Sequence, residues 1–166
     1  MNTSDLIPSD AILEQVYTGV TFAEGPAADA EGNVYLSDCP NNRILCYRPA
    51  DGTTVIWKDP SQRANGMNFD SEGRLLTCCA GAPDLPNGAR SLLRYEHDGS
   101  VTNLASHYDG KRLNAPNDLC FDRQGRIYFT DPQYGDRSED EQDCMAVYRL
   151  ELDGSVTRVI DDMQYP

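Results

Sequence analysis

Three side chains that could hold a hard cation open three similar stretches of the chain: Glu24, Asn65 and Asn117. A carboxylate and two amide carbonyls are oxygen donors, which suit Ca²⁺ and similar ions better than metals that prefer thiolates. The alternative is that Asn-Gly and Asn-Asp pairs form turns whose side chains cap the backbone. Glu24 favours the cation, because Glu-Gly-Pro needs no acid to make its turn. We therefore expect these three side chains to converge.

The stretches that follow these opening residues repeat one another. In each, a turn glycine stands eight positions after the opening residue, and an Asp-Gly turn recurs further along. The opening residues are separated by 41 and then 52 positions. Repeats of about 40 to 50 residues with several strands each are typical of propeller blades. Equivalent positions on successive blades form a ring around the propeller axis, which is where the opening residues would meet.

Each repeat divides into four short strand candidates. In the third repeat they occupy residues 119–122, 126–131, 146–152 and 156–160, joined in pairs by Asp- and Gly-rich loops typical of hairpins. The outer strands of the first two repeats correspond to residues 43–48, 53–58, 91–96 and 101–105. No segment has the length and 3.6-residue period of a convincing helix. The insertion 132–144 is charged and unpatterned, so we expect a solvated loop, with a functional lid as the alternative.

These patterns predict an all-β fold of about three four-stranded blades from an incomplete β-propeller. A closed propeller typically needs four to eight blades. The next opening motif would fall just beyond Pro166, so we expect residues 12–166 to be the N-terminal half of one propeller domain, ending before its fourth blade. A polar segment, residues 1–11, precedes it. Residues 12–20 are expected to form a strand that helps to close the ring.

Composition narrows the classes of partner. The chain has 166 residues, 27 acidic against 14 basic side chains and a formal net charge of −13. This charge argues against nucleic acid and against an anionic membrane surface as partners. Residues 1–10 are polar and acidic, so we expect no signal peptide and a cytoplasmic location. The six cysteines lack zinc-ligand spacing, and we expect buried free thiols.

Four strings, in this order and spacing, resemble the gluconolactonase / senescence-marker-protein (regucalcin-like) family. They are Phe22-Ala23-Glu24-Gly25-Pro26, Ala64-Asn65-Gly66, Asp109-Gly110-Lys111-Arg112-Leu113-Asn114-Ala115-Pro116-Asn117-Asp118 and Tyr128-Phe129-Thr130-Asp131-Pro132-Gln133-Tyr134-Gly135. The resemblance covers the chain from about Ile12 to Pro166 and implies a six-bladed propeller with one divalent cation in its central channel.

The resemblance also implies roles for particular residues. Glu24 and Asn117 would be metal ligands, and Asn65 and Asp118 would lie near the ion or the substrate. The remaining ligands, including the aspartate that acts as catalytic base, would lie beyond Pro166. The expected ion is Ca²⁺, with Zn²⁺, Mg²⁺ and Mn²⁺ as alternatives.

The implied reaction is hydrolysis of a carboxylic ester bond in a small-molecule sugar lactone. The cation polarises the carbonyl, and a carboxylate base activates water. Since Ca²⁺ takes about six to eight oxygens, two protein ligands leave mostly water, and we expect the isolated chain to be inactive. The alternatives are a non-catalytic propeller that binds partners, and a strictosidine-synthase-like or paraoxonase-like enzyme. The oligomeric state stays open.

Other polar residues receive structural interpretations. No Gly-x-Ser-x-Gly motif marks a serine esterase. Asp38 and Asp131 end equivalent strands, where structural hydrogen bonding is expected. His97 and His107 are expected to be solvated or structural. Arg112 either helps to bind an acidic sugar or lies in a surface loop.

Overall fold

A computed structural model describes residues 7–81 and 90–166 of the chain. These residues form three antiparallel sheets of four strands and one two-stranded hairpin. The first sheet holds β1 (Ala23–Ala28), β2 (Val34–Asp38), β3 (Arg43–Arg48) and β4 (Thr53–Lys58). The second holds β5 (Ala64–Phe69), β6 (Leu75–Cys79), β7 (Ser91–Tyr95) and β8 (Val101–Ala105). The third holds β11 (Leu119–Phe121), β12 (Ile127–Asp131), β13 (Ala146–Leu150) and β14 (Val156–Ile160), and the hairpin is β9 (His107–Tyr108) with β10 (Lys111–Arg112).

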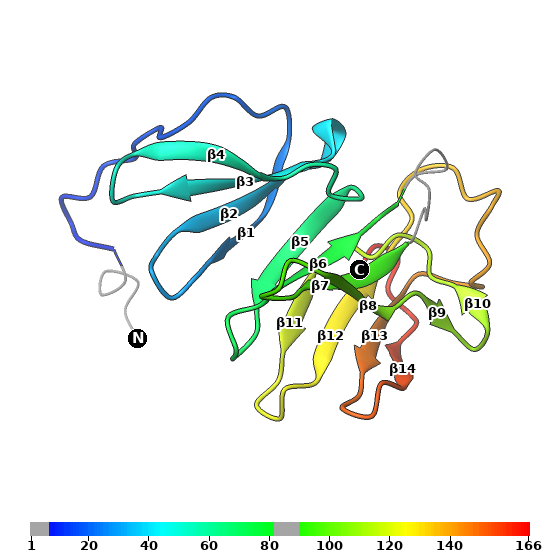
Figure 1. Ribbon diagram of the computed structural model, residues 1–166. Coiled ribbons are helices and arrows are strands. Elements are labelled where there is room, and N and C mark those ends of the chain that lie inside the picture. Colours follow the sequence, from blue (N-terminus) through cyan, green and yellow to red (C-terminus); the bar gives the residue numbers. More distant parts are fainter. Residues whose placement is uncertain (1–6, 82–89) are drawn as a thin grey trace.

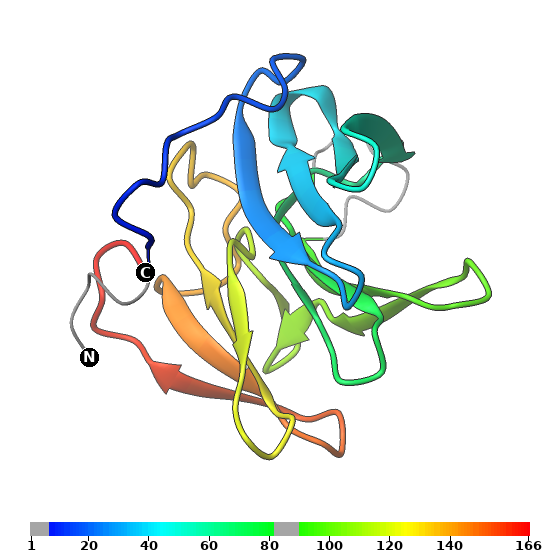
Figure 2. The ribbon, with the colours of Figure 1, turned by 90° about the vertical axis from the view of Figure 1, so that its left-hand side faces the viewer.

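The predicted all-β organisation is therefore confirmed. The strands of each sheet pair in chain order, and the sheets follow one another in sequence, fanning out in the two perpendicular views (Figures 1 and 2). Within the described ranges, the helical structure is a single 3-10 turn, Cys39–Asn41. No helix found there is both long and apolar enough to cross a bilayer.

Aspartate side chains explain why the repeats share their turns. Asp29, Asp70 and Asp122 each accept two backbone N–H groups in the turn after the first strand of a sheet. A second set accepts N–H and hydroxyl groups in the turn after the third strand: Asp51, Asp98 and Asp153. Local side-chain acceptors of this kind stabilise tight turns. These six of the 27 acidic side chains thus serve hairpin turns rather than a ligand.

The second sheet lies between the other two, and both of its faces are buried. Every residue of β6 is buried, and alternate side chains enter different cores. Leu76 and Cys78 pack into the core shared with the third sheet, whereas Leu75 and Cys79 pack into the core shared with the first. Because successive side chains of a strand point to opposite faces, one strand serves both layers. This packing fixes the relative placement of the three sheets.

Two sequence-based expectations about the N-terminal region need comment. Residues 12–20 do not form the expected strand: they pair with no neighbouring strand, and Ile12 and Leu13 are 89% and 103% exposed. An extended segment without a ladder partner has no cross-strand hydrogen bonds to hold it as a strand. Of the polar segment 1–11, residues 1–6 lie outside the described residues.

The cysteines are all free thiols, as expected, but they are not all buried. Cys46, Cys78 and Cys79 are buried, and Cys120 is exposed. Cys120 pairs with Tyr128 on the face of the third sheet that is turned away from the second sheet. Its exposure follows from this position, which no neighbouring sheet covers.

The insertion 132–144 contains no strand or helix, as predicted, yet its last part is firmly attached. Gln142 is only 4% exposed, and the carbonyls of Tyr108, Lys111 and Arg112 share the two N–H groups of its Nε2 at 3.0–3.2 Å. The expectation of a simply solvated loop is therefore wrong at Gln142, because these contacts join the insertion to the hairpin β9–β10.

Candidate functional site

The opening residues lie where the first strands of the three sheets meet. Both β1 and β5 carry an irregularity in their pairing at this place, between Glu24 and Ala27 in β1 and between Ala64 and Met67 in β5. Bulges of this kind re-aim side chains and are frequent beside active sites. Glu24 and Asn65 therefore both stand at the start of a bulge rather than in a regular ladder.

Backbone contacts bring neighbouring opening residues together. A Cβ atom added to Gly25 would lie 2.1 Å from the carbonyl oxygen of Asn65, so the two strands touch directly. On the other side of β5, the N–H of Gly66 donates to the carbonyl of Asn117 at 2.7 Å. The Oγ of Ser37 lies 3.1 and 3.0 Å from the carbonyl oxygens of Glu24 and Asn65, which share its single hydroxyl proton. These contacts place the backbones of Glu24, Asn65 and Asn117 in one row.

The third opening segment is held by the adjacent strand β12. The N–H of Asn117 donates to the carbonyl of Thr130 at 2.9 Å, and the N–H of Thr130 donates to the carbonyl of Asp118 at 3.0 Å. Asp118 is exposed, and its Oδ1 accepts the N–H of Leu119 at 2.8 Å. A Cβ atom on Gly66 would lie 2.2 Å from the same Oδ1. One carboxylate oxygen of Asp118 is thus directed at the second sheet and engaged by the backbone.

Three side chains in the row have no protein partner of their own. Glu24, Asn65 and Asn117 are half-buried, and among residues 7–81 and 90–166 none of their side-chain atoms makes a hydrogen bond or ion pair. One carboxylate and two amides without a protein partner are, by their chemistry, a donor set that fits a hard cation. The described residues hold no group of three or more His, Cys, Asp or Glu side chains placed to bind a metal ion. Any cation here would accordingly depend on one carboxylate, amide oxygens and water.

Two buried carboxylates flank the row. Asp38 and Asp131 are fully buried at the ends of β2 and β12. Burial raises the pKa of Asp131 to about 7, even though backbone N–H groups favour its ionised form. For Asp38, burial also raises the pKa, but hydrogen bonds from Asn41, from Arg43 and from the backbone lower it further, to below its ordinary value. The structural hydrogen bonding predicted for both residues is confirmed.

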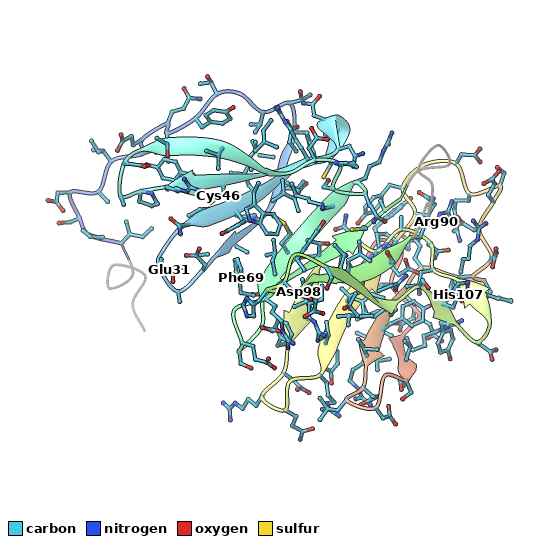
Figure 3. All side chains as sticks on the ribbon, viewed as in Figure 1. Glu31, Cys46, Phe69, Arg90, Asp98 and His107 are labelled. Atoms are coloured by element: carbon cyan, nitrogen blue, oxygen red, sulfur yellow. The ribbon has the colours of Figure 1, made fainter. Side chains whose placement is uncertain are left out.

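The remaining polar candidates make ordinary structural contacts. His97 bonds the carbonyl of Glu72 at 3.0 Å, and both histidines are exposed, as predicted. Arg112 forms an ion pair with Glu141 of the insertion. Arg90 and His107 lie on the right-hand side of Figure 3, Arg90 paired with Asp140 of the insertion and His107 on the hairpin. Among these residues, only Arg112 and His107 belong to the element that leads directly to Asn117.

One hydrogen bond next to the opening residues was not predicted from the sequence. Asn42 lies in the turn after β2, in the left-handed region at φ 53°, and its side chain accepts the N–H of Arg63 at 2.7 Å. The pairing crosses from the first sheet to the lead-in of the second. Only the Asn-Asn pair before β3 could have indicated it, since asparagine tolerates the left-handed region.

Comparison of the chain with known proteins identifies its family. Residues 22–166 match the family described as the SMP-30/Gluconolactonase/LRE-like region. A gluconolactonase from Zymomonas mobilis is 30% identical over 176 aligned positions, which cover 93% of this chain and 47% of that protein.

Solved structures give the same picture. A gluconolactonase from Xanthomonas campestris superposes with a TM-score of 0.79 at 36% identity, over 88% of this chain and 50% of that one. Regucalcin from Agrobacterium tumefaciens, described as a calcium-binding protein, superposes with a TM-score of 0.61 at 18% identity, over 89% of this chain and 45% of that one. The sheets are therefore blades of a β-propeller. The chain spans about half the length of the relatives it matches.

Proposed function

The chain belongs to the SMP-30/gluconolactonase/LRE-like family, and from this premise we propose that its three blades form part of a divalent-cation-dependent hydrolase of a small-molecule lactone. The observation that carries the proposal is the row of unpaired oxygen donors. Glu24, Asn65 and Asn117 come from three successive blades, and none of their side chains is used by the protein within the described residues. A turn-capping asparagine would instead bond its own backbone.

We assign Glu24 and Asn117 as cation ligands and Asn65 and Asp118 as groups near the ion or the substrate. When bound, a divalent cation polarises a lactone carbonyl and stabilises the negative charge that develops on its oxygen. The contribution of the chain is to hold the donors: Glu24 and Asn65 stand at the bulges of β1 and β5, and Ser37 ties the first two strands together. Ca²⁺ is the favoured ion because all donors are oxygens.

Catalysis requires more than these three blades. The Glu24 and Asn117 donors supply two protein ligands, whereas Ca²⁺ takes about six to eight oxygens. Three blades leave the axis open, and the family resemblance matches no residue of this chain to the catalytic base. We therefore propose weak calcium binding and no lactone hydrolysis by the 166-residue chain, and activity in a longer polypeptide whose further blades complete the ring.

The decisive experiment is a calorimetric calcium titration of the chain and of Glu24→Gln. We expect a dissociation constant on the order of 0.1–1 mM, and a loss of affinity of at least about tenfold in the variant. Glu31→Gln is the matched control, because Glu31 is an exposed glutamate in the same blade, and its affinity should be unchanged. Equal binding by wild type and Glu24→Gln would reject the assigned site.

The reaction is tested separately. A pH-stat assay with glucono-δ-lactone should show activity for the completed propeller, loss with EDTA, and none for the chain alone. Calcium binding without lactone hydrolysis by the completed propeller would favour a non-catalytic binding module. Hydrolysis of phosphotriesters, or amine–aldehyde condensation, would instead indicate paraoxonase-like or strictosidine-synthase-like chemistry. The cytoplasmic location stays a prediction from the sequence.

A further inference from the structure

One hydrogen bond recurs before every opening residue. In all three cases a side-chain oxygen accepts the backbone N–H of the residue that lies two positions before the opening residue. Phe22 donates to Asp38 Oδ1 at 3.3 Å, Arg63 to Asn42 Oδ1 at 2.7 Å, and Ala115 to Asp131 Oδ1 at 2.8 Å. The three donors precede Glu24, Asn65 and Asn117, respectively.

In the first and third blades the acceptor occupies the same place. Asp38 ends β2 and Asp131 ends β12, and both are fully buried. Each also accepts a second N–H, from the residue three positions before the opening residue: Thr21 at 3.1 Å and Asn114 at 2.8 Å. A carboxylate thus clamps two consecutive peptide groups immediately upstream of a candidate ligand.

The second blade lacks this carboxylate and uses another residue. Cys79 stands at the end of β6, and a thiol is a weak acceptor. Asn42 of the first blade replaces it, with its backbone carbonyl also accepting the N–H of Ser61 at 2.8 Å. The lead-in takes a different path here, since Gln62 and Arg63 both lie in the left-handed region, at φ 59° and 56°. Such conformations are strained for residues other than glycine and persist only where the surroundings impose them.

The clamps matter because the opening residues stand at irregular places in the sheets. Pairing is interrupted just after Glu24 and around Asn65, and Asn117 precedes the first residue of β11. A bulge leaves the extra residues without their ladder hydrogen bonds. The ladder reaches only one residue upstream of Glu24 and Asn65, at Ala23 and Ala64, and in the third blade it begins after Asn117, so other contacts must hold the chain further upstream.

We infer that Asp38, Asn42 and Asp131 are positioning residues of the candidate cation site. Each fixes the backbone two residues before one donor, and thereby the place of that donor relative to the other two. None of them touches the ion or the substrate. The inference rests on the proposed function, because a positioning role presupposes that the row binds a cation.

The test compares two aspartates of the third blade in calcium titrations of the full chain. Asp131→Asn should lower calcium affinity by about tenfold, the size of effect typical of groups that orient metal ligands. Asp122→Asn is the matched control: Asp122 also accepts two backbone N–H groups, in the turn between β11 and β12, away from Asn117. It should lose stability, measured by urea unfolding, with less than about a twofold change in affinity.

A second pair keeps the test independent of whether Asp131→Asn folds. Asn42→Gly retains the left-handed backbone but removes the acceptor, whereas Asn42→Asp retains both. Calcium affinity should fall in Asn42→Gly and be restored in Asn42→Asp. If Glu24→Gln weakens binding but the Asp131 and Asn42 variants bind like their controls, the positioning role is wrong and the proposed site survives. If the wild-type chain binds no calcium, or Glu24→Gln leaves binding unchanged, both are overturned.

Discussion

At the scale of single residues, the site depends on how closely the first strands approach. Gly25 has φ +52°, and a side chain there would meet the Asn65 carbonyl at 2.1 Å and the Cα of Gly66 at 2.7 Å. Only glycine combines a positive φ with so close a backbone contact at little cost. The turn glycine Gly32 of the same blade has φ +82° but nothing within 4 Å of an added Cβ. Both glycines have a positive φ, but only Gly25 contacts the next blade. Comparing the two positions therefore distinguishes the cost of the backbone conformation from the cost of the blade contact.

We therefore predict different costs for two identical substitutions. Gly32→Ala should lower the free energy of unfolding by about 1 kcal/mol through its backbone conformation alone. Gly25→Ala should cost at least about 2 kcal/mol more, because the blades must separate to admit the methyl group. Urea unfolding followed by Trp57 fluorescence measures both, since Trp57 lies in edge-to-face contact with Tyr35 of its own blade and with Tyr95 of the adjacent blade. Equal losses in the two variants would show that the contact is not tight.

At the scale of elements, the insertion 132–144 and the hairpin β9–β10 behave as one unit. Four consecutive residues of the insertion bind other parts of the chain. Three of them form ion pairs, Asp140 with Arg90, Glu141 with Arg112 and Asp143 with Arg158, and Gln142 forms hydrogen bonds with the hairpin carbonyls. The hairpin leads through Leu113 and Asn114 directly to Asn117. The insertion thus supports the approach to the third opening residue, even though it contributes no strand.

Gln142→Ala should loosen this unit. The substitution leaves the carbonyls of Tyr108, Lys111 and Arg112 without their buried donor, and we expect a loss of about 1–3 kcal/mol in the free energy of unfolding. Amide hydrogen exchange at Leu113, whose N–H donates to the Ser106 carbonyl within the unit, should speed up as well. Glu139→Ala, at an exposed position of the same insertion, is the control and should change neither. Unchanged exchange in Gln142→Ala would mean that Gln142 does not hold the hairpin.

The sequence anticipated the elements better than the contacts between them. The repeated turns located the strands to within one or two residues, and they identified the opening residues because those stand at a fixed distance from a turn glycine. The pattern could not show that Asn42 serves the next blade, or that Gln142 is buried, because each depends on residues brought together from distant parts of the chain. Residues 12–20 misled for a related reason, because the segment's own sequence does not show whether a partner strand is present.

At the scale of the whole molecule, two properties oppose each other. The third blade presents a face that no other described sheet covers, with a hollow of about 170 Å³ whose lining includes Cys120, Tyr128 and Val147. Apolar faces of this kind favour association. The net charge of −13 opposes the approach of two copies. Since salt screens charge over about 10 Å at 0.1 M and about 3 Å at 1 M, while leaving apolar contacts intact, ionic strength decides the balance.

Self-association of the chain should therefore increase with salt. Sedimentation velocity at a fixed protein concentration should show monomer at about 20 mM NaCl and a growing fraction of dimer or larger species near 1 M, where repulsion is screened. Val147→Lys places a charge in the hollow and should abolish the increase, whereas Asn103→Lys makes the same charge change on an exposed position of β8 and should not. If both lysine variants associate like the wild type, the open face of the third blade is not the contact. If association falls as salt rises, ion pairs rather than apolar burial hold the copies together, and the exposed blade face has no part in it.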